Sequence, residues 1–85
     1  MIEEKVRKLI ELPIQEMGIT IDNIVYEKEG SNYFLRITID RIKPIDIDTC
    51  VEVTRRINPL LDEADIIKDS YILDISSKEK GENNE

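Results

Sequence analysis

The residues with the clearest potential for chemistry are three aspartates around one predicted turn. Asp40 ends a segment of alternating apolar residues, and Asp46 and Asp48 open the helical pattern that follows. Grouped carboxylates can transfer protons or hold Mg²⁺. The same residues fit an ordinary helix start, in which Asp46 accepts the first main-chain amides and Asp48 favours the positive end of the helix dipole. We adopt the simpler explanation and expect neither a metal site nor catalytic carboxylates.

Cys50 is the only candidate nucleophile. A reactive thiol needs a base to activate it, and the chain contains no histidine. Its spacing places Cys50 on one apolar stripe with Ile47 and Val51, so we expect a buried thiol that packs as a small hydrophobe. The sequence therefore predicts a protein that is not an enzyme and that needs no cofactor.

The chain is strongly acidic, since 12 basic and 19 acidic residues give a net charge of −7. Nucleic-acid backbones are bound chiefly through Lys and Arg, so this balance disfavours direct nucleic-acid binding and favours a basic protein partner. The densest basic groups have acidic neighbours and no aromatic residues among them, which predicts solvated helix faces. These groups are Lys5, Arg7, Lys8, Arg55 and Arg56.

The sequence also indicates where the domain acts. No apolar run approaches the length of a membrane span, and no basic-then-apolar leader opens the chain. A single cysteine cannot form an internal disulfide, which fits a reducing compartment. We therefore expect a cytoplasmic domain with no membrane partner.

The elements that must position these residues begin with a helix. Apolar side chains recur at steps of three and four from Ile2 to Met17, and Gly18 follows as the expected stop. Pro13 removes an amide donor inside this pattern. We therefore expect either a kink near residues 9–13 or two helical pieces.

Two strands should follow the first helix. Residues 19–29 alternate with a slip of one position, which predicts a strand that starts near Asn23 or one that contains a bulge. After a turn at Gly30, residues 33–40 alternate cleanly, as in a half-buried strand of an antiparallel sheet.

A second helix and a third strand complete the pattern. The helix should begin after Asp46 and bend or end near Asn58, before a proline. Its predicted apolar stripe consists of Ile47, Cys50, Val51, Ile57, Leu60 and Leu61. A polar loop at residues 62–70, in which Ile66 and Ile67 are expected to fold inward, leads to a third strand at residues 71–75. The order predicts a two-layer α+β domain, with two helices packed on one face of a three-stranded sheet.

One face of this sheet should stay open. The alternation places five residues on it: Phe34, Arg36, Thr38, Ile72 and Asp74. Phe34 and Ile72 would form an apolar patch there, which predicts recruitment of a partner or formation of a homodimer.

The order and spacing of several segments resemble the N-terminal domain of the bacterial ribosome maturation factor RimP family. The segments that carry the resemblance are Leu12-Pro13-Ile14, Met17-Gly18, residues 24–30, residues 34–40, Asp46-Ile47-Asp48-Thr49-Cys50, Leu61-Asp62 and Tyr71 to Ser77. It spans about residues 2–77. We accordingly divide the chain into a RimP N-terminal-like domain at 1–76 and a polar, disordered tail at 77–85.

The resemblance implies a role without chemistry in the maturation of the small ribosomal subunit. Proteins of the family continue after two serines with Pro-Gly, a basic stretch and an SH3-like barrel that is implicated in contacting a basic ribosomal protein. Here Ser76 and Ser77 lead into Lys78-Glu79-Lys80, so the barrel's contact is not carried over. The acidic corner formed by Asp40, Asp46 and Asp48 is the implied contact for a basic partner, and the two serines shape the exit from the sheet.

Two alternatives remain open. The α-β-β-α-β order also resembles the topology of KH-type RNA-binding domains, although the Gly-x-x-Gly loop with which those domains clamp RNA is missing. The chain could also be an isolated fragment whose only property is that it folds.

Overall fold

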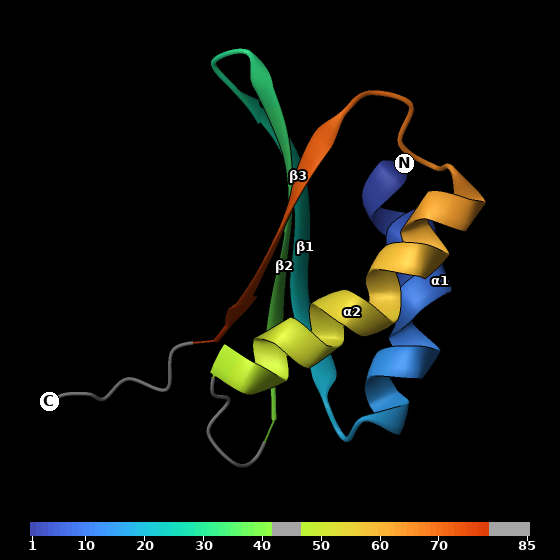
Figure 1. Cartoon of the computed structure of the whole chain (residues 1–85), viewed down its shortest axis with the longest axis vertical. Helices are drawn as coiled ribbons and strands as arrows, with labels where there is room; N and C mark the ends of the chain where they lie inside the picture. The colour runs from blue at the N-terminus through green and yellow to red at the C-terminus, as the bar shows by residue number, and fades with distance from the viewer. Residues whose placement is uncertain (42–46, 79–85) are drawn as a thin grey trace, which may run out of the picture.

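The structure, a computed structural model, describes residues 1–41 and 47–78. Its elements are α1 (Ile2–Glu16), β1 (Thr20–Glu29), β2 (Asn32–Asp40), α2 (Ile47–Ala64) and β3 (Tyr71–Ser77). The strands form one sheet in the order β1-β2-β3, and both helices cover the same face of it (Figure 1). The predicted two-layer α+β fold is confirmed.

Helix α1 is one continuous element despite Pro13. Its buried stripe is Val6, Ile10 and Ile14, at steps of four. The alternative of two helical pieces is wrong, because the one hydrogen bond that a proline removes costs less than the packing of this stripe on the sheet. Gly18 has a φ of +77°, and its amide donates to the carbonyl of Gln15 at 2.9 Å, so it ends the helix as predicted.

Strands β1 and β2 form an antiparallel hairpin that turns at Gly30, which has a φ of +62°. The register shifts between Ile21 and Asn23, so the bulge is confirmed and the later strand start is wrong. The shift lets Ile21 and Ile24 both face the helices although three positions separate them. On β2 the buried set is Leu35, Ile37 and Ile39.

Strand β3 pairs with β2 in parallel, from Tyr33 opposite Tyr71 to Ile39 opposite Ser77. The expectation of an antiparallel sheet therefore holds for the hairpin and is wrong for the sheet as a whole. The physical reason is the connection: α2 carries the chain back along the sheet, and a strand that follows such a crossover enters in the same direction as the strand before it.

Helix α2 buries only part of the predicted stripe, of which Ile57 and Leu61 are confirmed. Its buried residues are Thr49, Val53, Ile57 and Leu61. The predicted members Ile47 and Val51 are 81% and 42% exposed, and Cys50 is half-buried. Apolar residues occupy two neighbouring stripes of this helix, and contact with α1 and β3 decides which one is covered. The helix also runs through Pro59 to Ala64, because this proline lies on the exposed side, where water can replace the lost hydrogen bond.

The loop before β3 closes the core. Ile67 is buried and Ile66 packs partly against the core, as predicted. The predicted helix cap Asp46 and residues 79–85 lie outside the described residues. Ser77, which the prediction assigned to the tail, is the last residue of β3. The domain boundary at 76 and the disorder of the tail stay predictions.

Candidate functional site

One face of the sheet carries no helix (Figure 1). The strand register arranges the side chains on this face in cross-strand rows. The rows that the strand register brings together are Glu27-Phe34-Ile72, Val25-Arg36-Asp74 and Asn23-Thr38-Ser76. The five residues predicted for this open face all lie on it. Ile72 is 47% exposed beside a half-buried Phe34, so an apolar patch reaches the surface.

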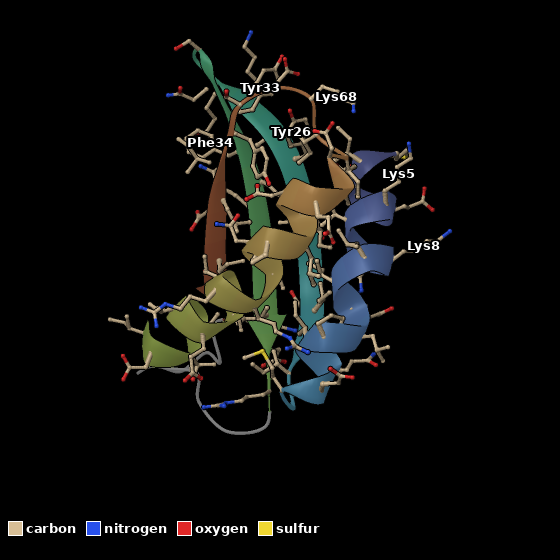
Figure 2. All side chains as sticks on the ribbon, turned by 45° about the vertical axis from the view of Figure 1, so that its right-hand side comes forward. Lys5, Lys8, Tyr26, Tyr33, Phe34 and Lys68 are labelled. Carbon is tan, nitrogen blue, oxygen red and sulfur yellow. The ribbon has the colours of Figure 1, made fainter. Side chains whose placement is uncertain are left out.

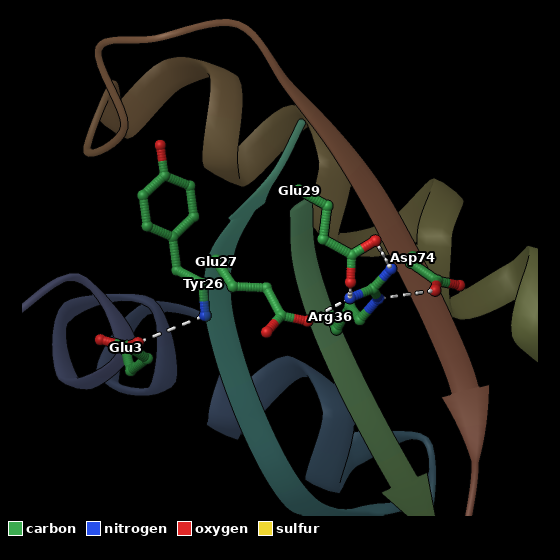
Figure 3. A network of polar contacts seen from close by, with 6 residues as sticks. All are labelled: Glu3, Tyr26, Glu27, Glu29, Arg36 and Asp74. Atoms are coloured by element: carbon green, nitrogen blue, oxygen red, sulfur yellow. Dashed lines mark hydrogen bonds and ion pairs between the residues drawn. The ribbon is translucent and has the colours of Figure 1, made fainter. Parts of the chain in front are cut away.

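Arg36 lies at the centre of this open face and binds three carboxylates (Figure 3). Its Nη1 atom pairs with Glu27 and, at 2.8 Å, with Oε2 of Glu29. Its Nε atom lies 3.6 Å from Oδ2 of Asp74. The hydrogen bonds that Arg36 donates, followed by its charge, lower the pKa of Glu29, and the same hydrogen bonds, accepted by Glu29, raise the pKa of Arg36. One guanidinium against three carboxylates leaves the cluster acidic.

The aromatic residues divide between the two faces of the sheet. The Arg36 guanidinium lies 4.5 Å from the centre of the Phe34 ring, a cation–π contact that couples the apolar patch to the acidic cluster. Tyr26 and Tyr33 instead stack on the helix side of the hairpin, with ring centres 5.5 Å apart (Figure 2). Burial, followed by the charge of Asp69, raises the pKa of Tyr26. Only Phe34 among these rings is placed to meet a partner on the open face.

The other predicted site residues that the structure describes lie at the end of the sheet where β2 and β3 finish. The parallel register sets Ser76 beside Thr38 and Ser77 beside Ile39, next to Asp40. The Asp40 carboxylate accepts a hydrogen bond from the Arg41 amide at 2.9 Å. Asp48 is exposed in the first turn of α2. The predicted binding residues thus fall into two groups, with Phe34 and Ile72 nearer the opposite end of the sheet.

The basic residues of α1 and α2 lie away from the open face, on the helix side of the sheet. Lys5 and Lys8 project outward from α1, on the other side of the molecule from Phe34 (Figure 2). Arg56 pairs with Glu16 at 2.9 Å, and Arg7 pairs with Glu11 at 3.5 Å. These ion pairs reduce the positive charge available to a phosphate backbone.

The described residues contain no group of three or more His, Cys, Asp or Glu side chains arranged to hold a metal ion. Cys50 packs partly against the core rather than being fully buried as predicted. Within residues 1–41 and 47–78, neither helix is long and apolar enough to cross a membrane. The expected lack of a metal, a cofactor and a catalytic site stays a prediction.

A comparison with protein families decides the identity. The family described as the RimP N-terminal domain matches residues 9–78, from the middle of α1 to the residue after β3. The chain belongs to the RimP N-terminal domain family. It is therefore a ribosome maturation factor domain, as the resemblance implied.

Sequence reasoning missed the β1 members of the open face of this RimP N-terminal domain: Asn23, Val25, Glu27 and Glu29. They alternate with the buried Ile24 and the half-buried Tyr26, so the period of two was present in the sequence. The bulge hid the signal, because it breaks the alternation just before these residues. The acidic excess around Arg36 follows from their position.

Proposed function

We propose that this RimP N-terminal domain is a non-enzymatic interaction module in the maturation of the small (30S) ribosomal subunit, acting in the cytoplasm. Its partner is the immature small subunit, contacted through a basic ribosomal protein. The observation that carries the proposal is the open sheet face, on which an exposed apolar patch adjoins an acidic cluster. Apolar contact supplies affinity in such an interface, and charge complementarity supplies specificity and speed of association.

The second group of predicted residues extends the proposed surface. The second group adds Asp40 and Ser76 at the end of the open face, where a basic partner that spans this face would meet them. Asp48 on α2 and Ser77 lie on the helix side of the same end of the sheet and add a second carboxylate and hydroxyl there. We assign the main energetic role to Phe34 and Ile72, because buried aromatic and aliphatic anchors dominate most interfaces and rim charges contribute little.

Co-sedimentation with immature small subunits at moderate salt tests the proposal. Ile72→Lys should weaken association at least about tenfold, since it places a charge in the centre of the apolar patch. Leu12→Lys is the matched control, because Leu12 is 64% exposed on α1, away from the open face. Loss of association in both variants, or in neither, would contradict the proposal.

The KH-like alternative gives a different result. Direct RNA recognition requires that the domain bind naked ribosomal RNA, with an affinity that falls steeply as salt rises. The proposed protein contact predicts no such binding. If the domain associates with neither subunits nor RNA, the remaining alternative is a fragment that only folds.

A further inference from the structure

The outer edge of β3 presents main-chain donors and acceptors that do not pair with β2. The Lys78 amide donates to the carbonyl of Ile39 on β2 at 2.8 Å. Because main-chain groups alternate along a strand, Leu73, Ile75 and Ser77 direct their amides and carbonyls away from β2. Among the residues that the structure describes, no strand pairs with this side of β3. A row of main-chain donors and acceptors therefore faces outward.

A groove runs along this edge, between β3 and the N-terminal half of α2. Its volume is about 410 Å³. The helix wall consists of Ile47, Cys50, Val51 and Thr54, and the strand wall includes Leu73, Ile75 and Ser77. Ile47 and Val51 are the exposed large hydrophobic residues of α2. The three residues of β3 whose main-chain groups face outward therefore also line the groove.

The open-face side of the same edge is acidic. Asp74 projects there between Ile72 and Ser76, and its carboxylate is 51% exposed. Arg36 neutralises it only in part, since Glu27 and Glu29 lie closer to the guanidinium. An extended segment lying beside β3 would therefore meet apolar groups on one side of the sheet and a carboxylate on the other.

We propose that the β3 edge binds an extended basic segment of a partner protein by strand addition. The segment pairs its main chain with Leu73, Ile75 and Ser77, places alternate apolar side chains in the groove, and presents Lys or Arg to Asp74. The identity of the partner as basic rests on the proposed function. A second copy of the chain fits less well, because its net charge of −7 would repel its counterpart. Residues 79–85 contain no apolar side chain to fill the groove.

The probe for this proposal is a synthetic nine-residue peptide in which valine and lysine alternate. Added to the full chain, it should slow amide hydrogen exchange at Leu73, Ile75 and Ser77 by at least about tenfold, since these amides gain acceptors. The amides of Asp74 and Ser76, which face β2, should not change. Equal slowing at odd and even positions would overturn strand addition.

Two control peptides separate main-chain pairing from charge. The same peptide methylated on the main-chain nitrogens that face β3 should lose binding, because it cannot donate to the β3 carbonyls. A valine–glutamate peptide should not bind, because its carboxylates face Asp74. Equal binding of either control peptide would contradict the proposal.

Variants of the chain test the groove and the carboxylate separately. Val51→Glu should weaken peptide binding about tenfold, and the matched Leu12→Glu should not. Asp74→Asn should weaken it about two- to fivefold at low salt and not at high salt, whereas Glu63→Gln, on the exposed side of α2, should have no effect. Equal effects of a variant and its control would overturn the assignment.

The peptide experiment contains no ribosome, so its failure leaves subunit association by the open face untouched. The chain alone could instead protect the amides of Leu73, Ile75 and Ser77 from exchange, to a degree that increases with its concentration. That result would assign the edge to self-association and overturn the proposal of a basic partner. Sedimentation of the chain over the same concentrations provides the independent measurement.

Discussion

The two outer edges of the sheet are built in opposite ways. On β1, the bulge between Ile21 and Asn23 interrupts the edge, and the outward amide of Tyr26 donates to the Glu3 carboxylate at 3.2 Å (Figure 3). On β3, the register with β2 is continuous from Tyr71 to Ser77, and the strand contains neither a proline nor a bulge. Bulges, charges and covering side chains are the devices by which proteins protect sheet edges.

The difference teaches that protection of an edge is selective. A domain that only needed to avoid aggregation would protect both edges, and the same sheet shows that this chain can do so on β1. The edge without a bulge is also the one beside the groove and Asp74. We therefore interpret β3 as the interaction edge and β1 as the protected edge.

The largest effect is expected at β2, which supports both edges. Ile37 is fully buried, so Ile37→Ala should lower the free energy of unfolding by about 2–5 kcal/mol through lost packing and a cavity. Urea denaturation measures this loss. Leu12→Ala, at an exposed apolar position, should change the free energy of unfolding by no more than about 0.5 kcal/mol. A loss as large as that of Ile37→Ala would show that burial does not determine the cost of the substitution.

Proline substitutions should distinguish the inner from the outer side of β3. Ser76→Pro should cost about 1–3 kcal/mol, because it removes an amide that faces β2. Ser77→Pro should cost clearly less, since its amide faces outward and prolines are tolerated on that side of an edge strand. Thermal unfolding of the two variants compares them directly. A larger cost for Ser77→Pro would reverse the assigned direction of the main-chain groups.

Glu3→Ala should expose the protected edge. It removes the acceptor of the Tyr26 amide, so we expect a loss of about 1 kcal/mol and faster hydrogen exchange at that amide. Glu4→Ala is the matched control, because both residues lie in the first turn of α1 and share the dipole contribution. If the two variants gave the same exchange rate at Tyr26, Glu3 would not cover the edge.

The smallest effect is expected when the pH is lowered and the carboxylates around Arg36, between the two edges, become protonated. The pKa of Glu29 is lowered from its ordinary value of 4.5, so its contribution to stability is present above that pH and is lost as the pH falls through the lowered value. Glu29→Gln should therefore have a melting temperature that falls less steeply than that of the natural chain between about pH 5 and pH 3. If the melting temperatures of the two proteins changed with pH in parallel, Glu29 would not be paired with Arg36 in solution.

Much of this fold could be predicted from local patterns. The stripe of α1, the alternation of β2 and the turn at Gly30 depend on neighbours within a few residues, and all three are confirmed. The face of α2 could not be predicted, because Ile47 and Val53 are both apolar and only packing decides between them. Of the candidate site, the open face was predictable in part, while the bulge concealed its β1 side.

The sequence by itself determined the elements, the aliphatic core, the acidity and the absence of histidine, because these depend on composition and short-range spacing. Only the tertiary structure decided that β3 lies parallel to β2 at an open edge. That placement also brings Asp74 to Arg36 and sets the α2 groove beside Leu73 and Ile75. The physical reason is that strand pairing across a crossover joins residues more than thirty positions apart, and its geometry depends on how α2 packs on the sheet.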